Sequence, residues 1–200
     1  MRKVIRKSLF ETASSSVHAL VVGKTPVEPS EYSKLVIYHG EWGWSVDEYS
    51  TPSEKASYLF QCLVTYLEPE KAKEAVNPLE EILKKNGIEF EYEPGYFEAD
   101  SDEEYFRSIG GYIDHSECAA SVACKLLKDE KDVLQFIFGK DSTLITGNDN
   151  GNEYGKYLYK KNLSTREKEF WTDREGVQHE YVYYKTKKNT RKVKILEKGN

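Results

Sequence analysis

Residues 88–93 read Ile-Glu-Phe-Glu-Tyr-Glu, a strict alternation of apolar and acidic side chains. Successive side chains on a β-strand point to opposite faces, whereas a helix would scatter these six residues around its circumference. The segment is therefore predicted to be a strand with one apolar face against a core and one wet face that carries Glu89, Glu91 and Glu93. A fold for this chain must place these three carboxylates side by side in water.

Helix signals cluster in the first two thirds of the chain. Thr51-Pro52-Ser53-Glu54 combines an N-cap threonine, a proline in the first turn and a glutamate at the third helical position, which together predict a helix start. Further helices are predicted from Pro69 to Asn86 with a restart at Asn77-Pro78, from Asp102 to Ile109, and from Asp114 onward.

Strand signals dominate the C-terminal third, where aromatic and β-branched runs alternate with turns such as Asp173-Arg-Glu-Gly176. Along the whole chain, strands are predicted at residues 3–10, 17–23, 34–39, 88–93, 133–138, 142–145, 154–159, 169–172, 180–184 and 191–196. The predicted fold class is α+β, with a mixed region of helices and strands over residues 1–139. An antiparallel β-meander is predicted over residues 140–200, packed with the first region as one compact domain.

The composition also predicts the cellular environment of the protein. No run approaches the ~20 apolar residues of a membrane span, and no apolar stretch of a signal peptide follows the basic N-terminal residues. The chain has three cysteines, Cys62, Cys118 and Cys124. Because an odd number cannot all be paired with one another, they indicate no disulfide framework. A soluble cytoplasmic protein without membrane contact is therefore predicted.

The net charge of −5 conceals two oppositely charged parts. Residues 156–200 hold 13 basic and 6 acidic residues, a net of +7, which leaves −12 for the remainder. The densest acidic block has eight carboxylates and no lysine or arginine, and it comprises Glu89, Glu91, Glu93, Glu98, Asp100, Asp102, Glu103 and Glu104. Such asymmetry predicts two surfaces for different neighbours, unless both are simply solvated faces.

Cys118 is the best candidate for a catalytic residue. It stands near the start of the helix predicted from Asp114, where the helix dipole would lower the pKa of its thiol. This layout resembles papain-like thiol hydrolases, in which a histidine arrives later on a strand, and His179 would take that role here. Cys118 also shares an i, i+4 row with Val122 and Leu126, the pattern of a buried residue, and no family signature surrounds it. An inert Cys118 is the preferred interpretation, and the hydrolase is the alternative.

No cofactor or metal motif is complete. Gly23-Lys24-Thr25 ends like a phosphate-binding loop, but His18 stands where the first glycine is required. Cys118 and Cys124 would lie roughly 120° apart around a helix, which does not suit a shared metal ion. Neither a cofactor nor a metal ion is predicted.

A second, basic surface is predicted near the C-terminus, made of Lys185, Lys187, Lys188, Arg191, Lys192 and Lys194. Together with the neighbouring tyrosines it could track a phosphate backbone, but lysines also protect an edge strand from aggregation. A chain of net −5 is repelled by nucleic acid at long range, so direct nucleic-acid binding is the less favoured interpretation.

The acidic block is the preferred working surface. Glu89, Glu91 and Glu93 would be spaced by about 7 Å on an extended strand, close to the spacing of phosphates along a nucleic-acid strand. The sequence thus predicts a non-enzymatic interaction protein that binds a basic protein partner through an acidic, tyrosine-rich surface. The expected partner is a nucleic-acid-handling enzyme, inhibited in the way that phages and mobile elements counter host defence.

Overall fold

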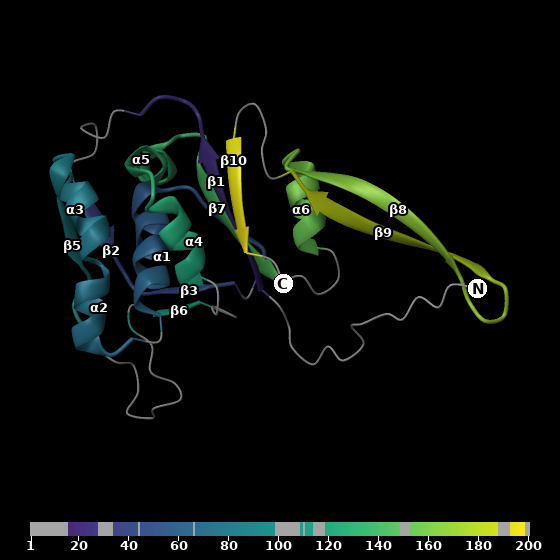
Figure 1. The fold of residues 1–200 in the computed structure, drawn as a ribbon, viewed down its shortest axis with the longest axis horizontal. Coiled ribbons are helices and arrows are strands. Elements are labelled where there is room, and N and C mark those ends of the chain that lie inside the picture. Colours follow the sequence, from purple (N-terminus) through teal and green to yellow (C-terminus); the bar gives the residue numbers. More distant parts are fainter. Residues whose placement is uncertain are drawn as a thin grey trace.

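A computed structural model describes residues 16–27, 34–43, 45–65, 67–98, 109, 111–113, 119–148, 153–187 and 193–198. Helices and strands are mixed along the chain and an antiparallel hairpin forms near the C-terminus, so the predicted α+β class is confirmed. Figure 1 shows most helices on one side of a central sheet and the hairpin on the other side. The strand predicted over residues 3–10 lies outside the described residues, as does the helix predicted from Asp102 to Ile109 except for Ile109 itself. In the part of the chain that is described, no helix is long and apolar enough to cross a membrane.

The central sheet has four strands in the order β10-β1-β7-β4, and each pair is antiparallel. Its members are β1 (Ser16–Gly23), β4 (Asp47–Tyr49), β7 (Thr143–Asn148) and β10 (Val193–Lys198). β1 is buried on both faces, because Leu20 and Val22 join the main core while Ala19 and Val21 join a second, smaller core. The strand predicted over residues 17–23 is confirmed, and it is an inner strand of the sheet.

Helices cover the two faces of this sheet unequally. α1 (Pro52–Val64), α4 (Ala119–Leu126) and α5 (Glu130–Phe138) pack on the main-core side, and α6 (Glu153–Lys160) packs on the other. α1 begins where the sequence predicts, because the Thr51 hydroxyl accepts from the Glu54 N–H while the Glu54 carboxylate accepts from the Thr51 N–H. Such a reciprocal cap stabilises a helix start by about 1 kcal/mol.

Lys55 on α1 is a buried cation that joins three elements. Its ammonium group donates to the carbonyl oxygens of Gly139, at 3.1 Å, and Ser142, at 3.0 Å. Gly139 is the C-cap of α5, and Ser142 immediately precedes β7. A lysine at this end of a helix satisfies carbonyl groups that the helix leaves unpaired and interacts favourably with the helix dipole. α1, α5 and β7 are thereby tied together inside the core.

Two short parallel pairs of strands lie beside α1. β2 (Leu35–Ile37) pairs with β5 (Phe90–Tyr92), and β3 (Gly40–Trp42) pairs with β6 (Gly111–Ile113). α2 (Pro69–Ala75) and α3 (Asn77–Lys85) lead into β5. As predicted, the helix stops at Asn86-Gly87: Asn86 is the C-cap of α3, and Gly87 follows with a φ of 71°, a conformation that glycine adopts without strain.

Two predicted strands are wrong. Residues 133–138 lie in α5, where Val133, Phe136 and Ile137 share the buried face. Residues 154–159 lie in α6, where Tyr154 and Leu158 are buried one helical turn apart. Both runs are short and rich in aromatic residues, a composition that favours a strand, but the spacing of their buried positions is helical.

β8 (Ser164–Thr172) and β9 (Gln178–Thr186) form an antiparallel hairpin, which is called the arm below. The predicted turn that begins at Asp173 is confirmed: the Asp173 carboxylate accepts from the N–H groups of Glu175 and Val177, and Gly176 has a φ of 85°. α6 packs against the base of the arm, and the far end projects away from the body of the protein (Figure 1). The antiparallel character predicted for the C-terminal part is confirmed, although β7 and β10 flank β1 and do not pair with the arm.

Candidate protein-binding surface

β5 and the residues around it carry the predicted acidic surface. Glu89, Glu91 and Glu93 are exposed, whereas Phe90 and Tyr92 are partly buried and pack on Phe60 of α1 at ring-centroid distances of 6.1 and 5.5 Å. The alternation predicted for this strand is therefore confirmed. Glu98 is also exposed, while four other predicted members lie outside the described residues, namely Asp100, Asp102, Glu103 and Glu104.

The acidic row is partly neutralised by Lys34, which immediately precedes β2, and is contacted by His39 in the segment that follows β2. Lys34 forms an ion pair with Glu91, and both side chains are about half exposed. This pair corrects the expectation that the acidic block has no counter-charge. The expectation considered only residues close to the block in the sequence. Lys34 is 57 residues away from Glu91 in the chain, and the parallel pairing of β2 with β5 brings the two side chains together. Glu89 has no ion-pair partner among the residues that the structure describes.

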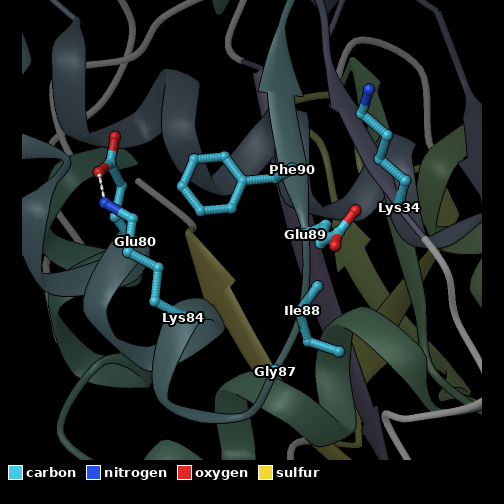
Figure 2. A pocket seen from close by; sticks show the side chains of 7 residues that line it. All are labelled: Lys34, Glu80, Lys84, Gly87, Ile88, Glu89 and Phe90. Atoms are coloured by element: carbon cyan, nitrogen blue, oxygen red, sulfur yellow. Dashed lines mark hydrogen bonds and ion pairs between the residues drawn. The ribbon is translucent and has the colours of Figure 1, made fainter.

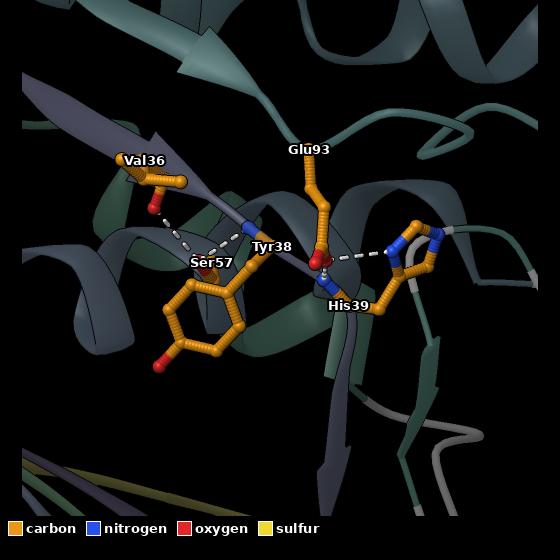
Figure 3. A network of polar contacts seen from close by, with 5 residues as sticks. All are labelled: Val36, Tyr38, His39, Ser57 and Glu93. Atoms are coloured by element: carbon orange, nitrogen blue, oxygen red, sulfur yellow. Dashed lines mark hydrogen bonds and ion pairs between the residues drawn. The ribbon is translucent and has the colours of Figure 1, made fainter.

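Glu93 is held by His39, as Figure 3 shows. One oxygen of its carboxylate accepts from the backbone N–H of His39 at 2.9 Å and lies 2.9 Å from Nδ1 of the His39 ring. These contacts, first the backbone N–H and then the ring, keep the pKa of Glu93 below its ordinary value. The Tyr38 N–H donates to the Ser57 hydroxyl at 3.1 Å, which fixes this loop to α1. Glu93 therefore has a defined position.

A groove of about 660 Å³ lies between α3 and the start of β5 (Figure 2). Phe90 points across it toward α3, where the Lys84 ammonium group lies 5.5 Å from the centre of its ring. Lys84 is paired with Glu80, and the Tyr92 hydroxyl donates to the other oxygen of that carboxylate. Burial, followed by this bond to Glu80, raises the pKa of Tyr92, so the hydroxyl stays a hydrogen-bond donor. The groove thus has a fixed wall with both charged and aromatic groups.

The backbone of β5 is hydrogen-bonded to another strand on one side only. The Leu35 N–H donates to the Glu89 carbonyl at 2.8 Å, and the Glu93 N–H donates to the Ile37 carbonyl at 2.7 Å. In a parallel pair these groups alternate, so the N–H and C=O of Phe90 and Tyr92 point to the opposite edge. No strand in the described ranges pairs with that edge. An open edge is a template on which an extended segment can add.

Three members of the predicted basic surface are described. Lys185 and Lys187 lie on or next to the arm, where Lys187 donates to Asn162. Lys194 lies on β10 and forms an ion pair with Asp132 of α5. The remaining predicted members, Lys188, Arg191 and Lys192, lie outside the described residues. The cations that are described are therefore divided between the arm and the central sheet.

His179 lies near the far end of the arm. Its Nε2 is 2.7 Å from Oδ2 of Asp173, and its ring stacks on Trp171 at 4.5 Å. The hydrogen bond from His179 lowers the pKa of Asp173. Figure 1 places this end of the arm well away from α4, while Cys118 lies outside the described residues. The thiol-hydrolase alternative therefore stays a prediction.

Within the described ranges, no group of three or more His, Cys, Asp or Glu side chains could hold a metal ion. No protein family, curated protein or solved structure matches this chain.

Proposed function

We propose that the protein is a non-enzymatic interaction protein that binds a basic segment of another protein at an acidic edge. The acidic edge consists of Glu89, Glu91 and Glu93 together with the outward backbone groups of Phe90 and Tyr92. The observation that carries the proposal is the coincidence of an unpaired edge on the three-residue strand β5 with an exposed carboxylate row formed by Glu91 on β5 and by Glu89 and Glu93 on either side of it.

The chemistry of the partner follows from this coincidence. An extended segment that adds to β5 would exchange main-chain hydrogen bonds with Phe90 and Tyr92, which supply affinity without sequence preference. Its alternate side chains would lie on the same face as the glutamates, where lysine or arginine is complementary. Lys34 already pairs with Glu91, but an exposed ion pair is worth only about 0–1 kcal/mol, so exchanging it costs little. Both contacts of His39 are to one oxygen of the Glu93 carboxylate, and the other oxygen is available to a partner.

Basic segments of this kind are abundant in nucleic-acid-handling proteins, whose phosphate contacts come from lysine and arginine. Carboxylates spaced by about 7 Å along a strand could occupy such contacts in place of phosphates. We therefore propose inhibition of a nucleic-acid enzyme, in the manner of phage or mobile-element proteins that counter host defence, as the biological role. Direct nucleic-acid binding is the weaker proposal, because a chain of net charge −5 is repelled by nucleic acid at long range.

The proposal is tested with a defined peptide, Lys-Val-Lys-Val-Lys-Val, whose lysines share one face when it is extended. Fluorescence anisotropy should show binding that weakens as salt rises from about 0.05 to 0.3 M. The double variant Glu89→Lys/Glu91→Lys should weaken binding by at least about tenfold, because it places two cations on the row.

The matched control is Glu70→Lys/Glu74→Lys on α2, which changes the net charge equally at two exposed positions. This control should bind almost as well as the wild-type protein. Equal weakening in both variants would show attraction to overall charge and would contradict a site at β5. Tight binding of an oligonucleotide by the wild-type protein would contradict the choice of the acidic surface.

A further inference from the structure

The arm exposes more apolar surface than its own two strands can cover. α6 contacts only the base of the arm, where the Ser164 hydroxyl donates to the Gly155 carbonyl at 3.1 Å and Tyr184 lies against Tyr159. Farther out, four large apolar side chains are 47–59% exposed, namely Phe170, Trp171, Val177 and Tyr181. A two-stranded hairpin alone in water is marginally stable. A further strand added to the arm would cover part of this exposed apolar surface and would stabilise the hairpin.

The hydrogen bonds within the arm show which backbone groups of β8 face outward. The Asp173 N–H donates to the Val177 carbonyl at 2.9 Å, and the Lys187 N–H donates to the Leu163 carbonyl at 2.7 Å. Hydrogen-bonded pairs alternate along an antiparallel ladder, so odd-numbered residues of β8 bond to β9. The N–H and C=O of Arg166, Lys168 and Phe170 consequently point to the outer edge. Among the described residues, no strand other than β9 pairs with β8.

Charges on β8 are sorted by face. Arg166 and Lys168 lie on one face with Phe170, and Glu167 and Glu169 lie on the other face with Trp171, because side chains alternate along a strand. Inside the arm, Lys168 is paired with Glu180 and Glu167 accepts from the Tyr183 hydroxyl. Arg166 and Glu169 have no ion pair within the described part of the chain. One face of the edge is thus cationic and the other anionic.

This sorting disfavours a second copy of β8 as the added strand. Residues directly opposite each other in a sheet point to the same face, so any register of two antiparallel β8 strands that brings their residues 166–169 opposite one another sets a cation against a cation, a glutamate against a glutamate, or both. Like charges opposite each other destabilise a sheet. The edge is therefore protected against self-association and open to a segment with the complementary order of charges.

We propose that β8 binds an antiparallel strand of another protein in which acidic and basic residues alternate. Opposite Trp171 and Phe170 this strand would carry apolar residues, and opposite positions 169 to 166 it would carry basic, acidic, basic and acidic residues in that order. The apolar pair fixes the register, since a slip of one residue would move every charge to the wrong face. This inference is independent of the binding proposed at the acidic edge. That edge requires a basic segment, whereas a strand with alternating acidic and basic residues has no net charge.

Two peptides of identical composition test the proposal with the full-length protein. Val-Val-Lys-Glu-Lys-Glu has the predicted order and Val-Val-Glu-Lys-Glu-Lys has the inverted order. Anisotropy titrations should show at least about tenfold tighter binding of the first peptide. Lys168→Pro removes an outward N–H while leaving the ladder with β9 intact, and it should abolish binding of both peptides. Gln178→Pro, which removes an outward N–H of β9, is the matched control and should preserve the preference.

A charge-swapped variant makes the test decisive. Combining Arg166→Glu, Glu167→Lys, Lys168→Glu and Glu169→Lys exchanges the two faces without changing the net charge. The preference between the peptides should then invert, and a circular dichroism spectrum should confirm that the variant is folded. The proposal is overturned if neither peptide binds the wild-type protein, if the preference fails to invert, or if sedimentation shows a dimer that Lys168→Pro dissociates.

Discussion

Lys55 gives the sharpest prediction about the stability of this fold. Its side chain is 1% exposed, and its ammonium group bonds to two carbonyl oxygens and not to a carboxylate. Burial lowers its pKa from 10.5 to about 8, while Glu54 and Asp141 act in the opposite direction. The native protein therefore binds this proton less tightly than the unfolded chain does.

The sign and size of the pH effect follow from that difference. Between pH 8 and 10.5 the unfolded chain holds more protons at this position, so the unfolding free energy rises with pH there. The full shift corresponds to about 3 kcal/mol, of which about 2 kcal/mol develops between pH ~7 and ~9.5. Below about pH 8 the native protein carries the whole cost of the buried charge.

Urea denaturation at about pH 7 and about pH 9.5 measures this contribution. The difference in unfolding free energy between wild type and Lys55→Met should change by about 2 kcal/mol between the two pH values, because methionine does not titrate. Lys71→Met, at an exposed position of α2, is the control and should show the wild-type pH dependence. Parallel pH dependence in wild type and Lys55→Met would refute the reasoning.

Two other predictions concern single groups near the candidate surfaces. His39→Gln should raise the pKa of Glu93 part of the way to its ordinary value, as a carboxyl ¹³C titration would show, since the ring contact is lost while the backbone contact remains. The stability that Glu93 supplies is present above the pKa of this carboxyl in the unfolded chain, and it disappears as the pH falls through the lower pKa of the native state. Acid unfolding of His39→Gln should therefore begin at a higher pH than acid unfolding of the wild-type protein. An unchanged titration of Glu93 in the variant would contradict the assigned contact. Cys124 is exposed and Cys62 is buried, so iodoacetamide should alkylate Cys124 in the native protein and Cys62 only after unfolding; peptide mapping that finds equal rates would refute this.

Local signals in the sequence were sufficient where neighbouring residues decide the structure. The cap at Thr51, the end of α3 at Asn86-Gly87 and the alternation around Glu91 each act within a few residues, and each is confirmed. The runs in α5 and α6 were misassigned because a short aromatic-rich run has the same composition in a buried helix and in a strand.

The candidate site could be predicted only in part, for a related reason. The exposed row of Glu89, Glu91 and Glu93 follows from strand periodicity alone. Its partners Lys34 and His39 depend on the parallel pairing of β2 with β5, which no local pattern encodes. The open edge of β5 likewise depends on which strand lies beside it, and that is a property of the whole fold.

The central claim is that a basic extended segment adds to the outer edge of β5, and amide hydrogen exchange followed by NMR tests it most directly. In the presence of Lys-Val-Lys-Val-Lys-Val, the amides of Phe90 and Tyr92 should exchange more slowly and shift, because their N–H groups become hydrogen-bonded to the peptide. Amides on α2 should not change. The account would be contradicted if the peptide bound while the amides of Phe90 and Tyr92 stayed unaltered, or if the largest changes fell on the arm.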